Sequence, residues 1–136
     1  MTEENRRKNL ARELERAAAA FQAAEALLGL GLTADSVSRA YYAAFHVARA
    51  LLLSRGLEAK THSGVVHMMN IEFVRAGLLS SSFNRLFAGL QRTREYADYD
   101  AAVTFSKEDA QAELTAARSF EAAVTELLRG EGWMSA

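Results

Sequence analysis

The side chains best suited to bind or transform a charged ligand are concentrated in residues 92–99. These eight residues combine two cations, two carboxylates and two phenols: Arg92, Arg94, Glu95, Tyr96, Asp98 and Tyr99. Arginine forms bidentate contacts with phosphates and carboxylates, and tyrosine can stack on a base. The segment therefore indicates either a structural network of charges or a groove for a phosphate-bearing ligand.

Helical spacing divides these side chains between two faces. Arg92, Tyr96 and Tyr99 recur at steps of four and three, whereas Arg94 and Asp98 form an i,i+4 pair on another face. The tyrosines on the Arg92 face predict partial burial, with hydroxyl groups that reach a partner or water. A solvated Arg–Asp pair contributes only about 0.3–0.5 kcal/mol, so the pair alone does not decide between a network and a groove.

A second polar stripe lies at residues 39–49. Arg39, Tyr42, His46 and Arg49 recur at steps of three, four and three beside an apolar stripe that includes Tyr41. Arginine and tyrosine are enriched at protein interfaces. The stripe therefore predicts a dimer seam or, alternatively, a nucleotide-binding face.

The three histidines do not follow the spacing of metal ligands. His62 and His67 are five residues apart rather than three or four, and the chain has neither a Glu-x-x-His motif nor cysteine. His62 is expected in the first turn of a helix, bonded to backbone or to a carboxylate. Glycine-rich phosphate loops and nucleophile motifs are also missing. We expect no metal, no cofactor and no self-contained hydrolase of a familiar kind.

The composition is that of a small globular protein. The 136 residues carry a formal net charge of −1, half of them are hydrophobic, and cysteine and proline are absent. This length fits one domain, residues 1–136, and the balanced charge gives no global attraction for nucleic acid. A cysteine-free chain suits a reducing cytosol, and no apolar run approaches the roughly 20 residues that cross a bilayer. We therefore expect a cytoplasmic protein without membrane contact.

Hydrophobic periodicity and glycine punctuation place these side chains on about five helices. The expected helices cover residues 3–28, a stretch from a cap at Thr33 or Asp35 to Gly56, residues 61–77, residues 80–101, and a last helix opened by a capping box at Ser106 and Asp109. Short connections favour antiparallel neighbours. The predicted fold class is all-α, an up-and-down antiparallel bundle with a four-helix core and one short helix.

Three motifs, in this order, give the chain a resemblance to the HEPN family (higher eukaryotes and prokaryotes nucleotide-binding). They are Ser-Arg-Ala-Tyr-Tyr-Ala-Ala-Phe at 38–45, Lys-Thr-His-Ser-Gly at 60–64 and Arg-Glu-Tyr-Ala-Asp-Tyr at 94–99. The resemblance covers about residues 5–128. It implies a helical bundle that dimerises and is often encoded beside a minimal nucleotidyltransferase. Many such proteins are ribonucleases or toxin components, with an active site shared between the two chains of the dimer.

The chain departs from the family's ribonuclease motif, which is an arginine followed after four to six residues by a histidine. Counted from Arg94, the histidine window falls on Tyr99, Asp100 or Ala101, and counted from Arg92 it ends on Tyr99. None of the window positions is a histidine. Tyrosine, with an unperturbed pKa of about 10, is a poor general base near neutral pH. The resemblance therefore implies a member with a degenerate nuclease motif.

The leading hypothesis is a homodimeric binding component of a module that resembles a toxin–antitoxin pair or contains a nucleotidyltransferase. Its ligand would be a nucleotide, RNA or a protein partner, with arginines on phosphate or carboxylate, Asp98 orienting an arginine, and tyrosines stacking. One alternative is a metal-independent ribonuclease that uses Arg94 with a histidine, His62 or His46, brought in from elsewhere in the fold. Another is a purely structural or interaction bundle. The expected groove residues are Arg92, Arg94, Asp98, Tyr99, Arg39, Tyr42 and His62.

Overall fold

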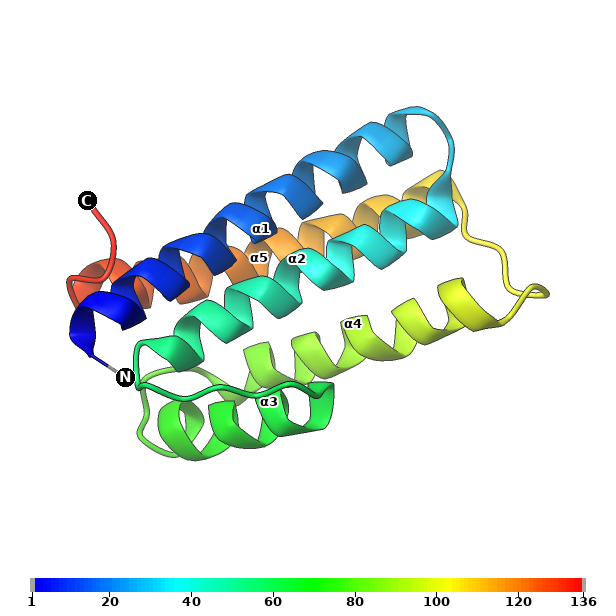
Figure 1. Ribbon diagram of the computed structural model, residues 1–136. Helices are drawn as coiled ribbons and strands as arrows, with labels where there is room; N and C mark the ends of the chain where they lie inside the picture. The colour runs from blue at the N-terminus through cyan, green and yellow to red at the C-terminus, as the bar shows by residue number, and fades with distance from the viewer. Residues whose placement is uncertain (1, 136) are drawn as a thin grey trace.

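Five α-helices form a bundle in the computed structural model, which describes residues 2–135. Consecutive long helices run in alternating directions, and a short helix lies between the second and the third long helix (Figure 1). No strand occurs within the described residues, which confirms the all-α fold class. The helices are α1 (Glu3–Gly29), α2 (Thr33–Leu53), α3 (His62–Met69), α4 (Ser81–Tyr99) and α5 (Lys107–Gly130).

The central helix of the bundle is α2, which packs against α1, α4 and α5. Its inward face consists largely of alanine, and small side chains allow neighbouring helix axes to approach closely. Because α2 has neighbours on three sides, only a narrow strip of its surface is left for polar side chains. The fully buried alanines are Ala40, Ala43, Ala44, Ala48 and Ala50.

The start of α2 differs from the expected cap. Leu32 is the N-cap, makes no side-chain cap bond, and precedes Thr33 as the first helical residue. The reason is the preceding turn, in which Gly31 has a φ of 77° and the Leu32 N–H donates to the Leu27 carbonyl at 2.9 Å. The turn that ends α1 passes through Gly31 to Leu32, and Thr33 is already helical. The N-cap position of α2 therefore falls on Leu32, whose side chain cannot accept a hydrogen bond. The prediction of a cap at Thr33 or Asp35 is wrong.

The segment expected to be the third helix contains a π-helical turn at Asn70–Val74, directly after α3. One extra residue in a turn rotates the inward face. Val65, Met69 and Phe73 are buried, whereas Val66 is only partly buried. Thr61 caps α3, so His62 is its first residue, and α3 packs against both α2 and α4.

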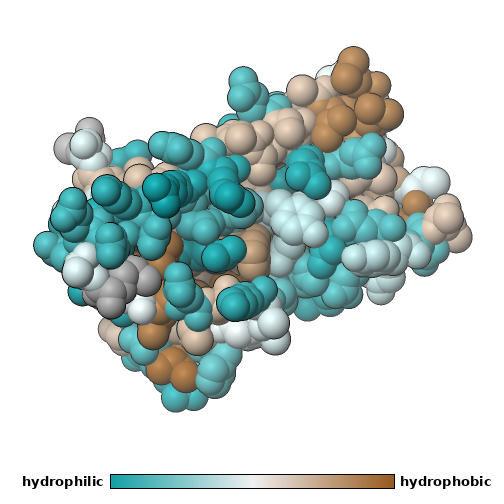
Figure 2. Space-filling model, viewed as in Figure 1, coloured by the Kyte–Doolittle hydropathy of each residue, from teal (hydrophilic) through white to brown (hydrophobic). Residues whose placement is uncertain are grey.

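Apolar surface is exposed at the turn between α1 and α2. Leu30 is 74% exposed and Leu32 is 48% exposed, and Figure 2 shows a hydrophobic patch over this end of the bundle. Within residues 2–135, none of the helices has both the length and the apolar character required to cross a membrane.

The predicted capping box at the start of α5 is formed in the structure, and its contribution to stability can be measured. The Asp109 N–H donates to Ser106 Oγ at 3.0 Å, and the Ser106 N–H donates to Asp109 Oδ2 at 3.1 Å, which confirms the predicted motif. We expect Ser106→Ala to lower the free energy of unfolding by about 1 kcal/mol, measured by urea denaturation. Ser119→Ala, at an exposed position in the middle of α5, is the matched control and should not be destabilised. Equal stability of Ser106→Ala and the wild type would contradict the cap's role.

Candidate functional site

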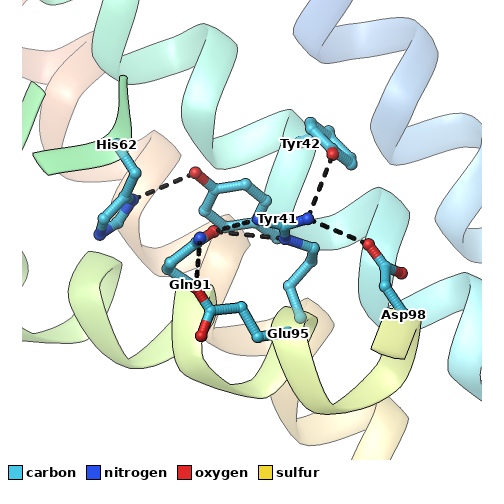
Figure 3. A network of polar contacts seen from close by, with 7 residues as sticks. Tyr41, Tyr42, His62, Gln91, Glu95 and Asp98 are labelled. Atoms are coloured by element: carbon cyan, nitrogen blue, oxygen red, sulfur yellow. Dashed lines mark hydrogen bonds and ion pairs between the residues drawn. The ribbon is translucent and has the colours of Figure 1, made fainter. Parts of the chain in front are cut away.

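A cluster of polar and aromatic side chains lies where α2, the first turn of α3 and the second half of α4 meet (Figure 3). We call it the Arg94 cluster. Its bonds join all three elements, although their residues are far apart in the sequence. The members are Tyr41, Tyr42, His62, Gln91, Arg94, Glu95 and Asp98.

Arg94 points into the bundle. It follows the buried Phe87 and Leu90 at steps of seven and four, so it lies on the inward face of α4. Its side chain is only 12% exposed. A charge so placed is stable only when its donors are satisfied, because desolvation without a partner is costly.

Two neighbours on α4 hold the guanidinium group. Nη1 of Arg94 donates to Asp98 Oδ2 at 3.1 Å, and Nε and Nη2 donate to Gln91 Oε1 at 3.3 and 3.0 Å. Nη1 also donates to the Tyr42 hydroxyl at 3.4 Å. Burial by itself would lower the pKa of Arg94, but the Asp98 hydrogen bond and the nearby Tyr42 and Tyr99 hydroxyls raise it above its ordinary value. Arg94 therefore stays charged, with its guanidinium group held by Gln91, Asp98 and Tyr42 and next to the Tyr99 hydroxyl.

Aromatic rings surround the same guanidinium group. Its central carbon lies 5.2, 5.5 and 5.8 Å from the ring centroids of Tyr41, Tyr42 and Tyr99. Arg39 lies over Tyr42 as well, at 5.2 Å. Each contact falls within the range of a cation–π interaction. Tyr42 thus connects the inward Arg94 to the exposed Arg39.

His62 joins the cluster through Tyr41. The Tyr41 hydroxyl lies 3.1 Å from Nδ1 of His62 and has no other hydrogen-bond partner among residues 2–135. Burial raises the pKa of Tyr41, and burial together with the Arg94 charge lowers the pKa of His62, so both groups are neutral near pH 7. A buried phenol is satisfied only if it donates, so Tyr41 donates to Nδ1 and the imidazole proton sits on Nε2. The expectation that His62 bonds to backbone or a carboxylate is wrong.

Of the expected groove residues, the structure brings all but one into the cluster or into contact with it. The exception is Arg92, which is exposed and makes no hydrogen bond or ion pair with any described residue. Tyr96 and Tyr99 on the same face are 56% and 78% exposed, so the prediction of their partial burial is wrong. The inward side of α4 carries Arg94, and the Arg92 face consequently points to solvent.

Three members of the cluster are not among the expected groove residues: Tyr41, Gln91 and Glu95, which accepts from Gln91 Nε2 at 3.0 Å. Tyr41 follows the apolar spacing of α2 and is 3% exposed, so its pattern predicts only a core residue. Gln91 lies three residues before Arg94, a spacing at which helical side chains meet, and this was the available signal. His46 is not in the cluster, because its Nδ1 is 2.7 Å from Glu13 Oε2 on α1.

The cluster offers donors and rings rather than metal ligands. Among residues 2–135, no three histidine or acidic side chains are grouped closely enough to hold a metal ion. The carboxylate bonded to Arg94 is Asp98, which the arginine itself neutralises. An anionic, planar group is therefore the ligand for which this chemistry is best suited.

Fold and site together define a small all-α protein with a partly buried arginine held among tyrosines. Residues 11–127 match the family model described as HEPN domain. The chain therefore belongs to the HEPN domain family.

Several relatives share this similarity. "UPF0332 protein glr0978" from Gloeobacter violaceus is 38% identical over 99 residues, which cover 72% of this chain and 79% of that protein. "Putative toxin MJ0605" from Methanocaldococcus jannaschii is 40% identical over 79 residues, 58% of this chain and 59% of the relative. "UPF0332 protein PH1297" from Pyrococcus horikoshii is 49% identical over 53 residues, 39% and 37% of the two chains. In the last two comparisons the aligned segment covers less than two thirds of the relative's own length.

A solved structure has the same fold. It is the crystal structure of TT1696 from Thermus thermophilus, which superposes with a TM-score of 0.74 over 88% of this chain and 98% of that chain. The sequence identity is 23%, so the likeness concerns the fold alone.

The lowered pKa of His62 makes stability depend on pH with a definite sign. The unfolded chain, with a histidine pKa of about 6.5, takes up this proton at a higher pH than the folded chain does. The contribution of neutral His62 to the free energy of unfolding is therefore fully present above about pH 6.5, and it is lost as pH falls through the pKa of His62 in the folded chain. We expect His62→Gln, which can still accept from Tyr41, to lose less stability than the wild type between about pH 7.5 and 5.5. Urea midpoints at both pH values measure this.

His67→Gln is the matched control for this measurement, because His67 is exposed and bonded to no described residue. It should keep the wild-type dependence on pH. If His62→Gln showed the wild-type dependence too, the neutral Tyr41–His62 pair would be contradicted.

Proposed function

We propose that this HEPN-family protein binds the phosphate of a nucleotide or of RNA at the Arg94 cluster, and that it does so as a non-catalytic component of a toxin–antitoxin-like module. The observation that carries the proposal is the pairing of two guanidinium groups on one ring, Arg39 and Arg94 on Tyr42. Arg39 is exposed and makes no ion pair with a described residue. It can therefore meet a phosphate directly, next to the positive charge of Arg94 on the same ring.

Three neighbours of Arg94 have a role in this proposal. Asp98 and Gln91 fix the orientation of Arg94, and Asp98 lowers the net charge of the pair so that it remains stable without ligand. Tyr99 is 78% exposed next to Arg94 and offers a ring face on which a base can stack.

The proposal includes a homodimer and a minimal nucleotidyltransferase as the protein partner. The family resemblance supports both, and the name "Putative toxin MJ0605" of a relative supports the toxin–antitoxin context. Tyr96 and Tyr99 form an exposed aromatic face on α4, of the composition enriched at interfaces. Sedimentation at high micromolar concentration should give a dimer, and a strict monomer would remove this part of the proposal.

Arg39→Gln tests the phosphate contact without disturbing the buried part of the cluster. Loss of one charge-assisted contact, worth about 1.5–3 kcal/mol, should weaken binding of AMP and of a short RNA about tenfold or more. Arg75→Gln is the matched control, because Arg75 is equally cationic and exposed, at the end of the π-helical turn. Binding is measured by titration at low salt, where phosphate contacts are strongest. No binding at millimolar ligand would instead support a purely structural bundle.

A ribonuclease is the second candidate, and the position of His62 is the observation that favours it. Tyr41 bonds to His62 and contacts Arg94 through its ring, so one tyrosine links a histidine to an arginine. In the present arrangement, however, Nδ1 accepts from Tyr41 and Nε2 carries the proton, which leaves no lone pair for a general base. This is why we favour a binding role.

Incubation of RNA with the purified protein and a chelator separates the two candidates. We expect no cleavage above the background of an Arg94→Ala preparation. Cleavage by the wild type that both Arg94→Ala and His62→Ala abolish would establish the enzyme and overturn the non-catalytic proposal.

A further inference from the structure

Two hollows lie along the seam between α1 and α2, outside the Arg94 cluster apart from Tyr42. The first, of about 330 Å³, has a floor of small α1 side chains and is bordered by Arg16, Arg39, Tyr42 and His46. The second, of about 280 Å³, is bordered by Arg12, Arg16 and Arg49. Arg16 borders both hollows, so they adjoin along the same seam, and we call the two together the α1–α2 groove.

Three guanidinium groups of this groove have no hydrogen-bonded or ion-pair partner. Arg12, Arg16 and Arg39 are exposed, and none makes a hydrogen bond or ion pair with any residue between 2 and 135. By contrast, Arg55 and Arg118 elsewhere on the surface are bonded to Glu131 and Glu25 at 2.7 and 2.6 Å. Unpaired arginines along a groove are available to bidentate anionic groups.

The acidic residues of the groove do not cancel this charge. Glu13 bonds to His46 at 2.7 Å and pairs with Arg49 at 3.5 Å. Burial alone would raise the pKa of Glu13, but its bond to His46 and the charges of Arg49 and Arg16 lower it below the ordinary value. Glu13 is therefore a fixed carboxylate that is bonded to His46 and Arg49 and lies in the field of Arg16. Glu58 is the other acid at the rim. Four arginines against two glutamates leave a formal charge of +2, in a chain whose net charge is −1.

The dimensions of the groove suit one polymer strand. From the helical rise of 1.5 Å per residue, Arg39 and Arg49 are about 15 Å apart along α2. This length is several times the rise of about 3.4 Å per nucleotide of a strand in duplex DNA, so the groove is long enough for more than one phosphate. Alanines at 19, 20 and 23 line the first hollow, and their small side chains let the backbone of a strand approach closely.

We propose that the α1–α2 groove is a track for the backbone of a single-stranded polynucleotide that continues out of the Arg94 cluster. The inference rests on the proposed function and extends it from a nucleotide to a strand. Tyr42 is the junction, because its ring borders the first hollow and also contacts both Arg39 and Arg94. A basic groove that ends at an aromatic ring is the arrangement by which proteins bind single strands without reading their sequence.

The test compares a 12-nucleotide single strand with AMP on the double variant Arg12→Gln/Arg16→Gln. Both positions are exposed on α1 and glutamine is a good helix former, so the fold should be retained, as a melting curve verifies. We expect weaker binding of the strand and a dependence of log K on log salt that is shallower by about 1.4, at about 0.7 per lost contact. AMP should bind as to the wild type. Arg75→Gln/Arg129→Gln, two exposed arginines outside the groove, is the matched control for charge.

The outcomes separate the groove from the cluster. If AMP binds but the double variant binds the strand with wild-type affinity and salt slope, the proposal that the α1–α2 groove binds a strand is overturned. The proposed phosphate site at the Arg94 cluster then still stands. If the strand loses its contacts in the double variant while Arg39→Gln leaves AMP binding unchanged, the groove stands and the proposed phosphate site falls. Binding of neither ligand overturns both.

Binding experiments with other polymers identify the class of polymer that the groove binds. Oligouridylate and oligothymidylate distinguish RNA from DNA on the same track. Polyglutamate that displaces the strand at equal charge concentration, or a duplex that binds as tightly, would show that the groove selects charge alone and would overturn the assignment to a single strand.

Discussion

The inward position of Arg94 is the constraint on which the rest of the site depends. A guanidinium group that is 12% exposed must have its donors satisfied, and Asp98, Gln91 and Tyr42 do this from two helices. Because such a charge cannot be left without partners, these residues hold α2 and α4 in one relative position. The first turn of α3 is attached to the same point through the bond between Tyr41 and His62.

Adjacent residues of the central helix α2 face the hydrophobic core and the protein surface. Tyr41 is buried and stacks on Phe87, which in turn stacks on Phe120 of α5, so the site is continuous with the hydrophobic core. Tyr42, the next residue, faces the rim and meets Arg39 and Arg94. This explains how a rigid, alanine-lined bundle can present polar groups in fixed positions. Their geometry is set by packing rather than by a loop.

The polar side chains of α2 divide into two groups that the stripe at residues 39–49 did not separate. Arg39 and Tyr42 belong with Arg94, whereas His46 and Arg49 pair with Glu13 of α1. The two groups meet at the first hollow of the α1–α2 groove. A ligand site and a cationic groove can therefore share one helix face, and charge is supplied locally by a chain that is slightly acidic as a whole.

The sequence by itself determined the helices, the all-α class and the family, because periodicity, the Ser106 capping box and the order of the three motifs are local properties of the chain. It also indicated most of the site, since Arg94 and Asp98 are one helical turn apart. Only the tertiary structure decided that Arg94 faces inward and Arg92 outward, that Tyr41 rather than a carboxylate binds His62, and that the π-helical turn rotates the face after α3. Spacing relates residues within one helix, whereas these choices depend on which helix packs against which.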